Sequence, residues 1–230
     1  MGKISRYSFS LILFLYSGVV FSQAERTVGL RLGFDISKLS LNFIQPERKT
    51  FEGSMDMELF KNVYPAIEFG SNSIKLHKDT LFNYYSNGYY GRIGVDYNLI
   101  KPLDSADNEM LIAGIRYGYA FFNDHADSIR IKDNYWGDFH GNLPAKSLKA
   151  QWIELVFGLR TEVFKNFYLG FSIRSRMRLA KIKEDQAEPY WIPGYGKGNA
   201  KACFGFNYSI YYSLPLYKKQ FKIKEVTKDK

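Results

Sequence analysis

The segment from Lys149 to Lys181 reads KAQWIELVFGLRTEVFKNFYLGFSIRSRMRLAK. Two long arms, in which apolar and polar residues alternate, flank a short turn. This period of two is typical of β-strands with two different faces. Each arm exceeds the roughly five or six residues of a strand in a soluble protein and reaches the roughly 9–11 residues of a tilted strand that crosses a bilayer. The segment therefore predicts a β-hairpin of a membrane barrel.

The alternation also predicts the turn. If Lys165 and Asn166 formed a two-residue loop, Val163 would pair with Tyr168, and an apolar position would face a polar one. A three-residue loop, Phe164-Lys165-Asn166, keeps the apolar faces together and requires a left-handed backbone at Asn166, which asparagine tolerates. The same motif occurs at Glu58–Tyr64 (ELFKNVY), which resembles Glu162–Tyr168 (EVFKNFY). This near-repeat fits an internal duplication or a turn sequence common to barrels.

Eight strands of this kind are predicted. They cover Val28–Ile36, Phe51–Leu59, Val63–Phe69, Tyr89–Leu99, Leu111–Phe121, the two arms of the hairpin above, and Cys203–Leu214. The connections between them include loops at Gln45–Lys49, Ser71–Asn87, Lys101–Glu109, Asn123–Leu148 and Ile182–Asn199, and they alternate between longer and shorter. A barrel with long outer loops and short periplasmic turns has this alternation. We therefore expect an all-β, eight-stranded, antiparallel, up-and-down transmembrane β-barrel over residues 23–217.

The volume of the side chains indicates which face points inward. The apolar faces together carry roughly forty large side chains, more than eight strands can enclose. The other face carries small residues and charges of both signs, and an arginine facing lipid would cost about 2–4 kcal/mol at the midplane. The predicted lumen network comprises Arg31, Asp35, Glu52, Asp56, Glu58, Glu68, Arg92, Asp96, Arg116, Glu154, Arg160, Glu162, Arg174, Arg176 and Arg178. The alternative is a soluble periplasmic lipocalin-like barrel with its apolar face inside.

The two ends of the chain differ from the barrel. Residues 1–22 carry Lys3 and Arg6 before an apolar run and end in small residues, a pattern that predicts a secretory signal peptide. Residues 218–230 form a lysine-rich tail, expected in the periplasm. Export and a barrel together predict the cell outer membrane. The single cysteine, Cys203, lies in an alternating strand, which favours a packed side chain over a reactive thiol.

Stretches such as Gly29–Asp35, Gly94–Asn98, Gly114–Gly118, Trp152–Leu155, Ile192–Gly194 and Gly205–Tyr208 resemble an uncharacterised family of small Bacteroidetes-type outer-membrane β-barrel proteins, a domain of unknown function. The resemblance extends from about Val28 to Lys218. It implies the fold and the location, and no catalytic residues. One departure is the end of the chain, because barrel strands usually end at an aromatic residue, whereas the lysine-rich tail follows Tyr217.

The function is less determined than the fold. The formal net charge of +9 comes from bases that alternate with apolar residues or lie in the tail, so no nucleic acid partner is expected. Outer-membrane lipid is the expected partner, with a protein partner at the loops or tail, no cofactor and no metal. Tyr190, Trp191 and Tyr195 form a candidate loop contact, for which an aromatic girdle is the favoured alternative. The enzyme alternative is a lipid- or peptide-modifying hydrolase at the barrel surface, using His77, His125 or His140 with nearby carboxylates. The oligomeric state is left open.

Overall fold

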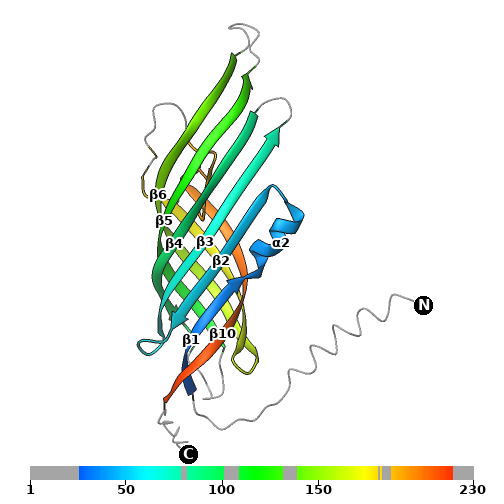
Figure 1. Ribbon diagram of the computed structural model, residues 1–230. Helices are drawn as coiled ribbons and strands as arrows, with labels where there is room; N and C mark the ends of the chain where they lie inside the picture. Colours follow the sequence, from blue (N-terminus) through cyan, green and yellow to red (C-terminus); the bar gives the residue numbers. More distant parts are fainter. Residues whose placement is uncertain are drawn as a thin grey trace, which may run out of the picture.

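The computed structural model describes residues 26–78, 82–100, 109–131, 139–180, 182 and 188–219. The predicted signal peptide, residues 1–22, and residues 220–230 of the predicted tail lie outside these ranges. Eight strands close into a barrel in the order β1-β10-β7-β6-β5-β4-β3-β2, and all neighbours are antiparallel (Figure 1). The predicted eight-stranded up-and-down fold is confirmed.

The barrel strands are β1 (Arg26–Asp35), β2 (Arg48–Met57), β3 (Val63–Lys78), β4 (Phe82–Asn98), β5 (Met110–Ile131), β6 (Phe139–Phe164), β7 (Phe167–Arg178) and β10 (Ala202–Lys219). A helix, α2 (Ile36–Ile44), follows β1, and a small hairpin of β8 (Trp191–Ile192) and β9 (Gly196–Lys197) lies between β7 and β10. Because β10 continues to Lys219, the barrel extends two residues into the predicted tail. We call the end with the short β2–β3 and β6–β7 connections the turn end, and the opposite end the loop end.

The two predicted turns have the expected backbone. Asn62 and Asn166 are the non-glycine residues with positive φ in the described chain, at 63° and 67°. The register Glu162↔Tyr168 is the one that a three-residue loop requires. In each turn a glutamate four positions earlier accepts a hydrogen bond from the asparagine backbone N–H, at 3.1 Å for Glu58 and 2.7 Å for Glu162. The repeated motif therefore has a structural reason.

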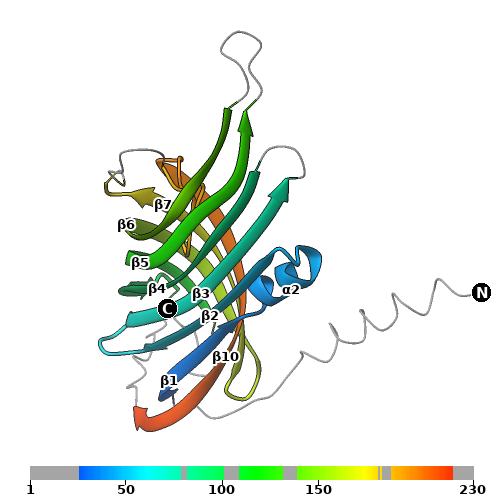
Figure 2. The ribbon, with the colours of Figure 1, turned by 45° about the horizontal axis from the view of Figure 1, so that its top comes forward.

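Two of the predicted loops are largely strand. β3 continues to Lys78 and β4 begins at Phe82, within the predicted loop 71–87, and β5 and β6 extend through most of 123–148. These four strands form a wall that rises above the rest of the barrel (Figures 1 and 2). The alternation persists there, but the outward residues are polar instead of apolar. Because the prediction relied on an apolar outer face, it ended these strands too early.

Helix α2 was also missed. Its first turn is capped by Asp35, whose Oδ1 accepts hydrogen bonds from the Lys38 backbone N–H at 3.2 Å and from the Ser37 hydroxyl at 2.5 Å. At its other end, the Asn42 side chain both donates to and accepts from the Thr50 backbone, at 2.9 and 2.8 Å. These contacts hold the helix against the start of β2. In the described chain, no helix has the length and apolar character needed to cross a membrane.

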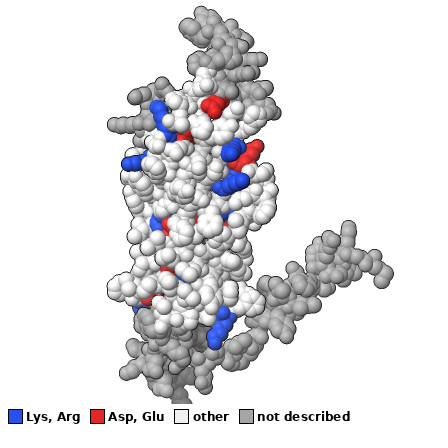
Figure 3. Space-filling view, viewed as in Figure 1, with Lys and Arg blue, Asp and Glu red and all other residues white. Residues whose placement is uncertain are grey.

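The barrel is apolar outside and charged inside. All eight barrel strands expose large apolar side chains, including Leu32, Phe51, Ile67, Ile93, Ile115, Phe157, Ile173 and Phe206. Most of the described barrel wall in Figure 3 is accordingly uncharged. The charged side chains that alternate with these residues are buried. Small residues make room for them and for large rings: a Cβ on Gly118 would lie 2.2 Å from the Trp152 ring.

Candidate functional site in the barrel lumen

The lumen contains a continuous set of ion pairs. Its centre is Glu68 of β3, whose carboxylate contacts three arginines: Arg92 at 2.8 Å, Arg116 at 3.2 Å and Arg174 at 2.5 Å. All four side chains are at least nine-tenths buried. Buried charges require such pairing, because removing an ion from water costs several kcal/mol.

The pairs extend from Glu68 toward both ends of the barrel. Toward the turn end, Asp96 is shared by Arg116 at 2.8 Å and Arg160 at 3.3 Å. Asp56 is shared by Arg160 and Arg31, each at 2.7 Å. Two of these arginines also stack on tyrosine rings: Arg31 lies 4.6 Å from the Tyr64 ring centre, and Arg160 lies 4.5 Å from the Tyr211 ring centre.

Toward the loop end, Arg92 contacts Glu52 at 2.9 Å and Glu154 at 2.8 Å, and Arg176 contacts Glu154 at 3.3 Å. The Asn207 amide donates to Glu52 at 3.0 Å and also to Asp35. These bonds connect twelve of the fifteen residues of the predicted lumen network: Arg31, Asp35, Glu52, Asp56, Glu68, Arg92, Asp96, Arg116, Glu154, Arg160, Arg174 and Arg176.

The remaining three residues have other roles. Glu58 and Glu162 accept the backbone hydrogen bonds of the two turns described above, at the turn end of the barrel. Arg178 lies at the loop end, where it contacts Glu188 at 3.2 Å and donates to the Gly198 carbonyl. These three residues therefore form contacts at the two ends of the barrel.

Several members of the network were not predicted. Tyr90 donates its hydroxyl hydrogen to Glu52 at 2.7 Å, and the Trp152 indole N–H donates to Glu154 at 2.6 Å. Lys38 of α2 also faces these charges. Its burial lowers the pKa of the ammonium group, an effect that Glu52 opposes. Alternation does not show which carboxylate the polar atom of an aromatic side chain will meet, and Lys38 could be placed only with knowledge of the helix.

The loop end of the lumen is covered by the β8–β9 hairpin. Ile192 and Tyr195 are fully buried in a cluster with Tyr90, Ala120, Phe122, Leu148, Ala150 and Trp152. The network holds the hairpin backbone, since Arg92 donates to the Gly194 carbonyl at 3.0 Å and Arg176 to the Tyr195 carbonyl at 3.1 Å. Gly194 has a φ of 75°, and a Cβ there would lie 2.5 Å from the Tyr90 ring. Glycine is therefore required at the tip of the hairpin.

The predicted loop contact of Tyr190, Trp191 and Tyr195 is divided between two environments. Tyr195 points inward and packs beside Trp152, with ring centres 5.9 Å apart, so it presents no surface to a ligand. Trp191 is half-buried, and Arg48 lies 4.1 Å from its ring centre. Tyr190 is exposed and contacts Tyr84 edge-on. The favoured alternative, an outer aromatic girdle, is wrong for Tyr195, because the hairpin folds into the barrel.

The histidines predicted in loops lie on strands. His77 of β3 is hydrogen-bonded to Asn83, and His125 of β5 stacks on Tyr85 with ring centres 4.6 Å apart. His140 belongs to β6, and its side chain lies outside the described part of the structure. Among the described residues, no group of histidine, cysteine and carboxylate side chains could hold a metal ion. Cys203 is partly buried against the cluster that the hairpin completes.

The fold and its lining define a class: a closed, eight-stranded, up-and-down β-barrel with an ion-paired interior and an apolar exterior, the polarity of membrane barrels. The chain belongs to the family described as Domain of unknown function (DUF6048), whose model matches residues 4–219. No curated protein matches it.

The solved structures that are similar to this chain include the following two. The N-terminal β-barrel domain of Pseudomonas aeruginosa OprF matches with 13% identity and a TM-score of 0.37, over 84% of this chain and 100% of that chain. Acinetobacter baumannii CarO2 matches with 10% identity and a TM-score of 0.40, over 83% of this chain and 99% of that chain.

Proposed function

We propose that this protein is an integral outer-membrane β-barrel with a closed lumen, and that it has a structural or interaction role at the cell surface instead of a transport or catalytic one. The observation that carries the proposal is the polarity of the barrel. Side chains such as Ile93, Phe157 and Phe206 are about 60% exposed, while the arginines and carboxylates between them are buried. A soluble lipocalin-like barrel requires the opposite arrangement.

Two layers support a closed lumen. Eight strands leave an interior just wide enough for side chains to fill. Here the ion pairs cross it from β3 to β7, and the β8–β9 hairpin packs above them. Moving a solute through the barrel would require breaking several buried pairs, and each carries a large desolvation cost.

An interaction role is supported by the wall of β3–β6 above the apolar band. Its outer face exposes polar side chains such as Lys75, Asn87, Asn123 and Ser147. The enzyme alternative has less support, since His77 and His125 form hydrogen-bonding and stacking contacts to Asn83 and Tyr85, respectively. We place a protein partner at this wall or at residues 218–230.

Membrane fractionation tests the location. The protein is expected in the outer-membrane fraction after a carbonate wash, and it should migrate faster on gels before boiling than after. Recovery as a soluble periplasmic monomer would refute the proposal.

Affinity capture from intact outer membranes tests the role. A variant in which Asn123 is joined by a short turn to Ser147 removes the β5–β6 extension at a paired position, where the two side chains are 2.7 Å apart. It should fold and lose the captured partner. The control replaces His77, His125 and His140 with Gln and should complement a deletion strain. If the histidine variant failed to complement the deletion while the shortened variant still captured the partner, the enzyme alternative would be favoured.

A further inference from the structure

Three rows of outward-facing residues cross the wall just above the apolar band. The register places Phe51, Ser71, Tyr89, Phe121 and Lys149 in the first row, Lys49, Ser73, Asn87, Asn123 and Ser147 in the second, and Lys75, Tyr85 and His125 in the third. The first row is mainly aromatic, the second carries amide and hydroxyl groups and a lysine, and the third contains Lys75 and His125. The three rows therefore form a boundary between apolar and polar surface.

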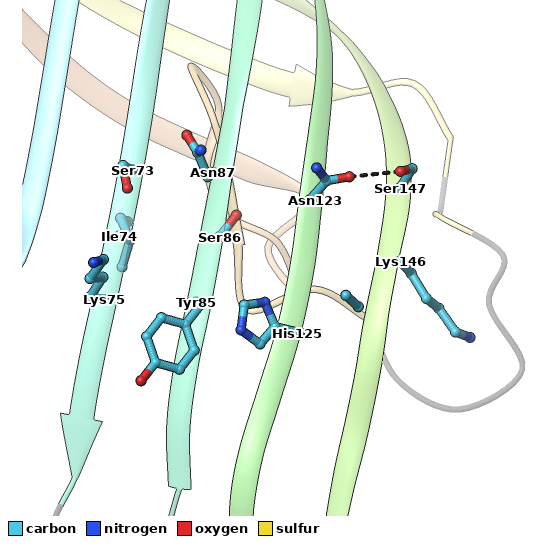
Figure 4. Close-up of a pocket in the computed structure, with 11 residues that line it drawn as sticks. Ser73, Ile74, Lys75, Tyr85, Ser86, Asn87, Asn123, His125, Lys146 and Ser147 are labelled. Carbon is cyan, nitrogen blue, oxygen red and sulfur yellow. Dashed lines mark hydrogen bonds between the residues drawn. The ribbon is translucent and has the colours of Figure 1, made fainter.

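This boundary is hollowed. One pocket of about 480 Å³ is lined by residues that include Ser73, Lys75, Tyr85, Asn123 and His125. Figure 4 shows Tyr85 and His125 side by side, with Lys75 and Lys146 on either side. A second pocket of about 240 Å³, lined by residues that include Lys49, Phe51 and Tyr89, lies beside the first. The two pockets share Ser73 and Asn87, so together they form one groove.

The groove has the charge of an anion site. The three rows contain three lysines and one histidine and no carboxylate. Lys49, Lys75 and Lys149 are exposed. Three acidic side chains lie near the groove: Asp127 is 4.0 Å from His125, Asp124 is the register partner of Lys146, and the exposed Glu47 precedes β2, where its backbone carbonyl accepts a hydrogen bond from the Lys75 backbone N–H at 2.9 Å. Lys49 lies two positions from exposed Phe51 on the same face of β2, so a cation is adjacent to the apolar band.

We propose that this groove binds the phosphorylated headgroup of a lipid in the leaflet that surrounds the loop end of the barrel. The acyl chains lie along Phe51, Phe69, Tyr89 and Phe121, the lysines bind phosphate oxygens, and the hydroxyl and amide groups of the second row donate to the headgroup. Basic surface at this level attracts anionic lipid, and the ammonium group of lysine binds phosphate as a point charge. The inference rests on the proposed membrane location.

The test is native mass spectrometry of the folded protein in neutral detergent, titrated with lipid A, a glycolipid with two phosphates. A saturable complex is expected with lipid A but not with phosphatidylcholine. Lys49→Gln with Lys75→Gln should weaken binding about 25-fold, because each lysine near an anionic lipid surface contributes about a fivefold factor. The matched control, Lys61→Gln with Lys165→Gln, removes two exposed lysines at the turns and should bind as the wild type does.

Three results would overturn the inference: equal weakening in both double variants, saturable binding of phosphatidylcholine, or equally tight binding of inorganic phosphate alone, which would make a free anion the ligand. Folding of each variant is checked by its gel shift on boiling. Failure of the wild type to fold in detergent would instead contradict the membrane location, so the two proposals are tested separately.

Discussion

Arg174 and Glu68 form a two-pronged ion pair across the full width of the barrel. The Nη1–Oε2 and Nη2–Oε1 distances are 2.5 and 3.1 Å, although the residues are 106 positions apart in sequence. Their strands, β7 and β3, are four strands apart in either direction around the eight-stranded ring. Bidentate pairs of this kind are the strong form of charge-assisted hydrogen bond. This pair therefore connects opposite sides of the barrel directly.

Glu68→Ala should lower the free energy of unfolding by about 3–5 kcal/mol, because it leaves Arg92, Arg116 and Arg174 buried without their shared carboxylate. Denaturant unfolding in detergent measures the loss. The control is Glu188→Ala, which removes the more exposed partner of Arg178 and should cost less than about 1 kcal/mol. Similar losses from the two variants would show that the central pairs are not what stabilises the barrel.

Ile173→Arg should prevent assembly in the membrane, whereas Ile173→Ala should be tolerated. Ile173 is 53% exposed on the outer face of β7, next to inward-facing Arg174. An arginine on the lipid face costs about 2–4 kcal/mol near the midplane. Assembly is scored by the gel shift on boiling. If Ile173→Arg assembled as well as Ile173→Ala, that face would not contact lipid.

Asn166→Ala should destabilise the β6–β7 turn by a part of the roughly 1–2 kcal/mol that a left-handed backbone costs an L residue, because alanine at a φ of 67° keeps the Cβ but loses the polar side chain through which asparagine tolerates this conformation. Asn166→Gly should cost less, since glycine adopts this backbone freely. The difference between the two variants in unfolding free energy is the measurement. Equal stability would mean that the strain is relieved elsewhere in the turn.

Planar-bilayer recording should show no stable conductance for the full chain. Gly194→Val should displace the β8–β9 hairpin, because the valine Cβ would lie 2.5 Å from the Tyr90 ring. The lumen should nevertheless stay closed, because the ion pairs still fill it. Reproducible open steps in the wild type would establish a pore. Steps only in Gly194→Val would show that the hairpin, and not the charged layer, is what closes the lumen.

The sequence allowed the barrel to be predicted where the lipid-facing alternation is visible. Ile173 beside Arg174 shows both faces of a strand, and the register of the β6–β7 turn follows from parity. The wall above the band was missed because the pattern inverts there: outward residues such as Asn87 and Asn123 are polar, and the inward Phe122 is apolar. The inward position of Tyr195 could not be predicted either, because an aromatic residue in a Pro- and Gly-containing loop fits a girdle as well as a lumen. Long-range partners such as Arg174 and Glu68 required the strand order.

The seam between the first and last strands has a consequence for biogenesis. Arg26 pairs with Lys219, and Asp35 with Ser209, so the sheet keeps two unpaired edges until the final strand of the barrel has been delivered. Open edges are templates for pairing with other chains. Under the proposed outer-membrane location, chains that end before β10 should therefore be substrates for periplasmic chaperones and proteases, even if the hairpins they contain are correctly formed. Under this proposal, quality control distinguishes chains that contain β10 from chains that lack it.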